Sequence, residues 1–182
     1  SVNLIVSTGT GVKGGVSGQL NDLVGGYVQL YADNDEQNSD YIEFTDEDLD
    51  VITEKIDHIK GATDMWMFNG AQTQSTKGTF DTAVTFGNES LQYYNTAPML
   101  KGRYFNRSEY QKASKVCVIT EKGAKKLFGS TDVLGLDVSM NLYGITQEYT
   151  IVGIRKDNDS AMKGMVFSSG DVELEIPTSV LD

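Results

Sequence analysis

Residues 114–129, SKVCVITEKGAKKLFG, contain the clearest change from strand to helix in the chain. KVCVIT is a short apolar run rich in β-branched residues, which predicts a buried strand. Thr120 then offers a hydroxyl that can cap a helix, and Gly129 is the residue type that most readily takes the left-handed conformation at a helix end. The stretch therefore predicts a strand followed at once by a short helix over EKGAKKLF.

The segments on either side of this stretch predict a β-rich section. Residues 136–156, LDVSMNLYGITQEYTIVGIRK, are typical of a hairpin of two strands around a turn that contains Gly144. Residues 71–90 are rich in Thr and Gly and have no helical period, and residues 93–113 combine short helical turns with an apolar tether. VELEIP, which ends at Pro177, predicts a last strand.

The first 70 residues have a different pattern, in which helices alternate with strands. A helix is predicted over 11–24 and a strand over 27–31. Thr45 precedes three carboxylates, as at the start of a helix, and an apolar stripe follows, formed by Leu49, Ile52, Ile56 and Ile59. Residues 64–70, DMWMFNG, then predict another strand.

These patterns together predict an α+β fold with two subdomains. Residues 1–70 and 156–182 are expected to form one, a part built from helices and strands. Residues 71–155 are expected to form the other, a β-rich part. At 182 residues the chain is long enough to bury one or two cores without cross-links.

Two ligand-binding motifs are suggested near the start of the chain, and both are rejected. Gly9, Gly11 and Gly14 have the spacing of a dinucleotide-binding loop, and Asp33 lies about 20 residues further on, where a ribose-binding acid is expected. A dinucleotide-binding fold needs further βα units, however, whereas residues 71–155 predict hairpins. A calcium loop starting at Asp33 fails because Asn38 and Phe44 stand where Gly and Glu are required.

Composition excludes several other classes of function. The chain has 15 basic and 26 acidic residues, and its net charge of −11 repels nucleic acids and anionic lipids. The single cysteine, Cys117, excludes an internal disulfide, and the lone histidine, His58, has no second histidine with which to share a metal. We therefore predict no catalytic, cofactor-binding or metal-binding residues, no cofactor and no enzymatic activity. The competing enzyme hypothesis would use the acids of residues 33–48, or Asp157 and Asp159, which are better explained as a solvated face.

Five segments, in this order, resemble a known family, the extracytoplasmic (periplasmic core) domain of MacB-like, or FtsX-like, ABC transporter permeases. They cover most of the chain, and they are STGTGVKGGVSGQLNDL (7–23), FTDEDLDVITEKIDHIKGATDMWM (44–67), MLKGRYF (99–105), SKVCVITEKGAKKLFGSTDVLGLDVSM (114–140) and EYTIVGIRK (148–156). The resemblance implies that the glycines of 9–14 belong to the exit of a transmembrane helix rather than to a pyrophosphate site.

The resemblance also implies a function in transport. Such a domain is extracellular or periplasmic, is inserted between the first and second of four transmembrane helices, and belongs to a permease dimer with a cytoplasmic ABC ATPase. It would couple ATP hydrolysis to movement outside the membrane (mechanotransmission) for export, lipoprotein release or activation of a partner, with an extracytoplasmic adaptor protein as a further partner. The alternative is an extracellular adhesion or ligand-capture module that is not coupled to transport.

The resemblance implies that residues 1–70 and 156–182 form a membrane-proximal part of βαβ-like, porter type, and that residues 71–155 form a distal, inserted β-rich part. It also implies where the ends of the chain lie. Residues 2–6 would be the stub of the first transmembrane helix, residues after 177–181 would lead into the second, and residues 71–155 would lie far from both ends. The acidic tract at 33–50 and the segment around Tyr93, Tyr94 and Tyr104 are candidate contacts for partner proteins.

Overall fold

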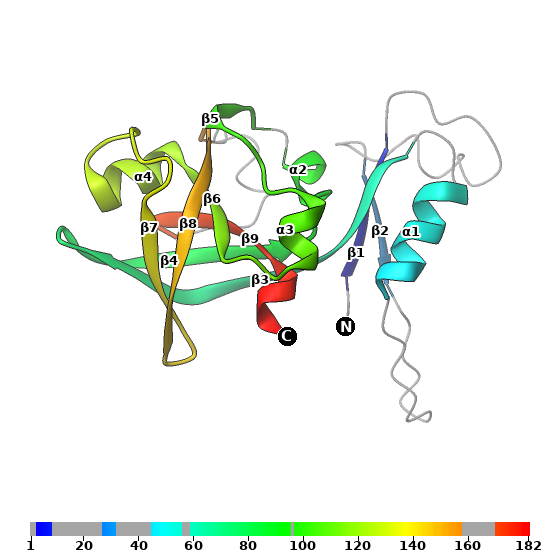
Figure 1. Ribbon diagram of the computed structural model, residues 1–182, viewed down its shortest axis with the longest axis horizontal. Helices are drawn as coiled ribbons and strands as arrows, with labels where there is room; N and C mark the ends of the chain where they lie inside the picture. Colours follow the sequence, from blue (N-terminus) through cyan, green and yellow to red (C-terminus); the bar gives the residue numbers. More distant parts are fainter. Residues whose placement is uncertain (1–2, 9–26, 32–44, 56–58, 96, 158–169) are drawn as a thin grey trace. The chain divides into compact units, whose positions relative to one another are not determined.

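The computed structural model describes residues 3–8, 27–31, 45–55, 59–95, 97–157 and 170–182 (Figure 1). The chain divides into two compact units. Unit 1 comprises residues 1–66 and 90–94, and unit 2 comprises residues 67–89 and 95–182. The described part is rich in strands and has short helices, consistent with the α+β class.

Unit 1 contains a small antiparallel sheet. Strand β1 (Asn3–Thr8) pairs on one side with β2 (Tyr27–Tyr31) and on the other with the first half of β3 (Ile59–Ser75). Helix α1 spans Asp46–Lys55, and the short helix α2 (Leu91–Tyr94) contacts β1. The strand predicted at 27–31 and the helix predicted after Thr45 are therefore confirmed.

The strands of unit 2 pair in a closed ring. The second half of β3 pairs with β4, and the ring continues through β9, β6, β8 and β7 until β7 pairs with β3 again. Strand β5 pairs with the end of β8, beyond the residues that pair with β7. The bounds of these strands are β4 Gly78–Gly87, β5 Met99–Gly102, β6 Val116–Thr120, β7 Asp137–Leu142, β8 Ile145–Arg155 and β9 Val172–Pro177.

The barrel encloses the main hydrophobic core. Side chains on alternate positions of its strands point inward, where helix α4 (Glu121–Phe128) also contributes residues. A buried pair of hydroxyls joins β3 to β4, with the oxygens of Thr73 and Thr82 2.8 Å apart. The large side chains that are almost fully buried are Phe86, Phe105, Leu91, Ile119, Leu127, Met140, Ile151, Ile154, Leu174 and Ile176; all except Leu91 belong to unit 2.

The strand and helix predicted at 114–129 are confirmed, with both caps. The Thr120 hydroxyl accepts a hydrogen bond from the backbone N–H of Gly123 at 3.2 Å, and Gly129 ends α4 with a φ of 74°. The predicted hairpin is also confirmed: Tyr143 and Gly144 both have positive φ, which matches the twist of the strands that they connect. Helix α3 (Arg107–Gln111) and the 3-10 helix η1 (Thr178–Leu181) complete the unit.

The cap of α4 gives a first testable expectation. Thr120→Ala removes the acceptor for the Gly123 N–H, and we expect the free energy of unfolding to fall by about 1 kcal/mol. Chemical denaturation monitored by circular dichroism would measure the change. Thr120→Ser, which keeps the hydroxyl, is the control and should retain most of the stability; equal losses in both variants would contradict the capping role.

Two predicted segments have a different structure. Ile59 is not the last residue of a helical stripe: α1 ends at Lys55 and Ile59 is the first residue of β3. Residues 3–8 form a strand paired on both edges rather than the stub of a helix. An apolar run this short fits a buried strand as well as a helix end, so its period could not separate the two.

The last strand is also in a different place from the one predicted. Residues 156–182 were grouped with 1–70, but β9 pairs in parallel with β4 and antiparallel with β6, inside unit 2. The C-terminal η1 contacts α3 and β4, so residues 71–155 do not lie far from the C-terminal end. Pairing partners far apart in sequence are not encoded in the strand itself, which explains the error. That residues 1–70 and 156–182 are membrane-proximal and residues 71–155 distal remains a prediction.

Candidate functional site

The positions considered for ligand binding fall partly outside the described residues. Gly9, Gly11, Gly14, Asp33, Asn38 and Phe44 all lie outside them, as do His58 and Asp159. Within the described ranges, no group of three or more His, Cys, Asp or Glu side chains could hold a metal ion. The acidic tract of residues 33–50 is described from Thr45 onward, where Asp46, Glu47 and Asp48 lie in the first turn of α1 and Asp48 forms part of its cap.

The acids at the start of α1 have a structural role. The backbone N–H and the hydroxyl of Thr45 both donate to Asp48 Oδ2, at 2.9 and 3.0 Å, and the Asp48 N–H donates back to the hydroxyl. This reciprocal cap lowers the pKa of Asp48 because its carboxylate accepts a backbone hydrogen bond. Asp157, another candidate acid, accepts a hydrogen bond at 3.0 Å from the N–H of Lys122 in the first turn of α4.

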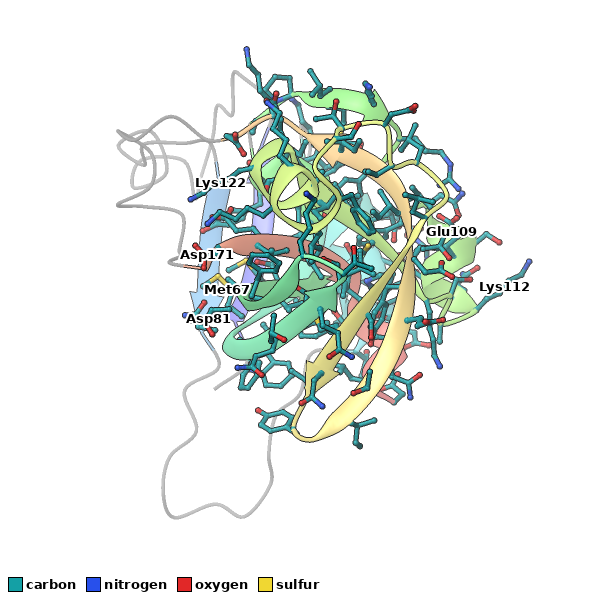
Figure 2. The ribbon with its side chains drawn as sticks, turned by 90° about the vertical axis from the view of Figure 1, so that its left-hand side faces the viewer. Met67, Asp81, Glu109, Lys112, Lys122 and Asp171 are labelled. Carbon is teal, nitrogen blue, oxygen red and sulfur yellow. The ribbon has the colours of Figure 1, made fainter. Side chains whose placement is uncertain are left out.

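Exposed ion pairs account for several other charges of unit 2. In Figure 2, Lys122 and Asp171 lie on one side of the view, and Glu109, on α3, and Lys112, which follows α3, lie on the other side. Asp171 pairs with Lys126 at 2.5 Å, and Glu109 pairs with Arg103 at 2.7 Å. In both cases the hydrogen bond to the cation is the main cause of the lowered pKa of the carboxylate. These are features of a solvated surface.

A buried charged cluster is the most unusual feature of the described residues. Arg155, at the end of β8, is 3 % exposed, and Glu175, in β9, is 9 % exposed. The arginine binds the carboxylate through two bonds, Nε to Oε2 at 2.8 Å and Nη2 to Oε1 at 3.1 Å. The Tyr104 hydroxyl donates to Oε1 at 3.0 Å, and the guanidinium carbon lies 5.3 Å from the centre of the Tyr104 ring.

The surroundings of Arg155 and Tyr104 shift the pKa of both groups. Burial is the largest single influence on Arg155 and disfavours its charge, but the interactions with Glu175 and Tyr104 together outweigh burial and raise the pKa of the guanidinium. Burial, followed by the charge of Glu175, raises the pKa of Tyr104 well above its usual value, so that the phenol stays neutral and donates its proton. The raised pKa values keep the guanidinium charged and the phenol neutral, so neither Arg155 nor Tyr104 is tuned for proton transfer near neutral pH.

The lone cysteine is likewise not activated. Cys117 is completely buried in β6, as its apolar neighbours predicted. Burial and, secondarily, the charge of Asp137 raise the pKa of its thiol far above the usual value. The thiol therefore stays protonated.

Arg155 also binds the backbone of the residues that follow α2 in the sequence. Its Nη1 donates to the carbonyl oxygens of Asn95 and Ala97, at 2.9 and 2.5 Å. Asn95 is the first residue of unit 2 after α2, which belongs to unit 1. Sequence reasoning missed this cluster, although a signal was present: Glu175 lies between Leu174 and Ile176, in a strand whose other polar residue is Glu173.

The exposed apolar residues differ from those predicted. Tyr94 and Tyr104 are buried, so the tyrosine segment is not an exposed contact surface, and only Tyr93 of the three is exposed. The largest exposures among the apolar side chains are instead at Tyr143 and Ile145, in the hairpin between β7 and β8. The Tyr143 ring packs against Phe68, with centroids 4.7 Å apart.

Charge is divided unequally between the units. Residues 1–66 and 90–94 hold 3 basic and 13 acidic residues, a net charge of −10, whereas the remainder holds 12 basic and 13 acidic residues, a net charge of −1. The repulsion of anionic partners inferred from the whole chain therefore applies to unit 1 and much less to unit 2.

A comparison with protein-family models shows the family of this chain. The model of the MacB-like periplasmic core domain matches residues 1–181. The chain belongs to this family. The MacB-like periplasmic core domain is the extracytoplasmic part of ABC transporter permeases, as the order of segments such as MLKGRYF and EYTIVGIRK indicated.

Solved structures share the fold of this MacB-like domain. The periplasmic region of MacB from Actinobacillus actinomycetemcomitans is 13% identical, with a TM-score of 0.58 over 98% of this chain and 66% of that chain. The extracellular domain of the noncanonical ABC-type transporter YknZ from Gram-positive bacteria is 22% identical, with a TM-score of 0.53 over 76% and 64%. The MacB-like domain thus spans less than two thirds of either chain. A comparison with curated proteins finds no match. None of the described helices is long and apolar enough to cross a membrane.

Proposed function

We propose that this MacB-like domain couples ATP hydrolysis in the cytoplasm to a conformational change outside the membrane, without catalysing a reaction itself. The observation that carries the proposal is the family match over residues 1–181. The change would drive export, release of a lipoprotein or activation of a partner. The domain would work as part of a dimer of permeases joined to an ABC ATPase, with an extracytoplasmic adaptor as a further partner.

The organisation of the chain supports a mechanical role. The chain passes between the units at residues 66–67, 89–90 and 94–95. One of these three covalent connections lies within the continuous strand β3, which pairs with β1 in unit 1 and with β4 and β7 in unit 2, so the backbone itself can carry a displacement from one unit to the other. The protonation states of Arg155, Tyr104 and Cys117 support a non-catalytic role, since none of them is poised for acid–base or nucleophilic chemistry.

The partner proposal can be tested by purification of the full-length protein. We expect it to be extracted from membranes by detergent together with a nucleotide-binding subunit or domain that hydrolyses ATP. Mutation of the ATPase nucleotide site should abolish that activity. A full-length protein found outside the membrane fraction, with no associated ATP hydrolysis, would contradict the proposal and favour the adhesion or ligand-capture alternative.

A second expectation concerns small ligands. We expect NAD, ATP and calcium not to bind this domain, because the strands of unit 2 form a closed ring with both parallel and antiparallel pairs rather than the open parallel sheet of a dinucleotide fold, and the calcium loop lacks its Gly and Glu. A ligand present at 100 times its dissociation constant would stabilise the domain by about 2.7 kcal/mol. Thermal unfolding with each ligand would detect this, and a rise of several degrees with any of the three would overturn the expectation.

A further inference from the structure

Residues 99–105, MLKGRYF, connect strand β5 to helix α3 within unit 2. Gly102 has a φ of 70°, and a Cβ at this position would clash with the carbonyl oxygen of Val152 in β8, so only glycine fits here. The next residues carry the side chains of Tyr104 and Phe105 into the interior, where both are buried. The segment therefore fixes the chain to the barrel immediately before α3.

Helix α3 is held together by a network of side-chain hydrogen bonds. The Asn106 side chain accepts from the Glu109 N–H at 2.9 Å, and the Glu109 carboxylate accepts from the Asn106 N–H at 2.9 Å, which is a complete capping box. Arg103 binds the same carboxylate through two bonds, Nη1 to Oε2 at 2.9 Å and Nη2 to Oε1 at 2.7 Å. A helix of five residues is too short to be stable alone, so these bonds decide whether it forms.

The C-terminal 3-10 helix rests on α3. Helix η1, drawn in red in Figure 1, contacts α3 and β4. The Ser179 hydroxyl donates to the carbonyl oxygen of Tyr110 in α3, and Val180 packs against the main core. Pro177, which precedes η1, has no side-chain acceptor that could cap it. A single turn of 3-10 helix has little stability of its own, so its contacts with the rest of unit 2 must hold it in place.

The same region also holds the strand that leads into η1. The Tyr104 hydroxyl donates to Oε1 of Glu175 at 3.0 Å, and Glu175 lies in β9, four residues before Ser179. Residues 102–110 therefore bind the C-terminal segment at two points, one in β9 and one in η1. Both points, and all the residues that make them, belong to unit 2.

We propose that residues 102–110 form a clamp that seats η1 on the barrel, and that Arg103 is a positioning residue of this clamp. Arg103 acts through Glu109: its two bonds keep α3 formed and thereby hold the Tyr110 carbonyl where the Ser179 hydroxyl reaches it. The role of the clamp in transport rests on the proposed function, in which residues after 177–181 lead into a transmembrane helix. A seated η1 would then pass a displacement to the barrel instead of unwinding.

The clamp can be tested in the 182-residue chain by the reactivity of two thiols. In Val180→Cys, the new thiol replaces a side chain that is partly buried against the core, so its rate of modification by a thiol reagent follows the opening of η1. Cys117 is the internal reference, because it is completely buried in β6 and reacts when the barrel itself opens. Mass spectrometry of peptides separates the two rates.

Three further variants are made in the Val180→Cys chain. Arg103→Gln should accelerate modification at position 180 about two- to fivefold, as for the loss of an exposed ion pair. Ser179→Ala, which removes the donor to Tyr110, should accelerate it about two- to tenfold. The rate at Cys117 should not change in either variant. Lys125→Gln is the matched control: it breaks another exposed ion pair, with Glu121 at 2.9 Å within α4, and should change neither rate.

A double-mutant cycle distinguishes positioning from independent stabilisation. If Arg103 places the carbonyl that Ser179 binds, the two substitutions disrupt one interaction. The combined variant Arg103→Gln with Ser179→Ala should then accelerate modification at position 180 by less than the product of the two single accelerations.

Four results would overturn the proposal. Arg103→Gln leaves the rate at position 180 unchanged, its effect multiplies fully with that of Ser179→Ala, Lys125→Gln accelerates modification equally, or position 180 and Cys117 accelerate together. Failure of the clamp in this chain would leave coupling to ATP hydrolysis open to its own test in the full-length protein. A full-length protein without associated ATP hydrolysis would leave the thiol rates unaffected, so the two proposals can fail separately.

Discussion

Glu175→Ala is expected to lower the free energy of unfolding of the barrel by about 3–5 kcal/mol. The substitution leaves Arg155 charged and 3 % exposed, with no carboxylate to compensate it, and removes the acceptor of the Tyr104 hydroxyl. Breaking one side of a buried ion pair costs more than replacing both sides, since a single desolvated charge remains. Urea denaturation followed by circular dichroism would measure the loss.

Two comparisons make this expectation specific. The combined Arg155→Met and Glu175→Leu variant should recover most of the stability lost in Glu175→Ala, because neither buried charge remains. Arg103→Gln, which breaks an exposed pair, should have a much smaller effect. If Glu175→Ala proved as stable as the unmodified chain, Glu175 would not compensate the charge of Arg155.

Phe86→Ala is expected to cost a similar amount, about 3–5 kcal/mol, through the cavity that it leaves. Phe86 is completely buried in β4 and belongs to the main core together with residues of β6, β8 and β9. A closed ring of strands has little freedom to collapse into the space, so the loss should lie near the upper end of this range. The same urea titration would measure it.

The control for Phe86 is Leu100→Ala in β5, where the side chain is 42% exposed. Its removal should change stability by no more than about 1 kcal/mol. Equal losses at Phe86 and Leu100 would mean that the barrel interior is not the main source of stability in unit 2.

Local sequence signals predicted most of the elements in unit 2. The cap at Thr120, the αL residue at Gly129 and the turn at Tyr143–Gly144 each depend on a few neighbouring residues, and all three are confirmed. Such features can be read from the sequence because the same residues supply both the conformation and its hydrogen bonds.

Long-range features were not predictable in the same way. The parallel pairing of β9 with β4 joins residues 90 positions apart, such as Thr82 and Val172, and nothing in VELEIP identifies its partners. The contact of Arg155 with Glu175 and with the Asn95 carbonyl depends on three segments that meet only in the folded barrel. The resemblance to a permease domain was carried by ordered segments such as MLKGRYF, and the family match confirmed it.

The most direct test of a mechanical role is a distance measurement in the full-length permease with its ATPase, in lipid nanodiscs. Nitroxide labels at Glu54→Cys in unit 1 and Asp132→Cys in unit 2 would be examined without nucleotide and with ATP trapped in a hydrolysis-deficient ATPase. Our account predicts a shift of the distance distribution between the two states, and no shift for the pair Lys112→Cys and Asp132→Cys within unit 2. The account would be contradicted if the distance distributions were identical in both nucleotide states. This applies to the distances between the units and to the distances between labels on the two permease copies.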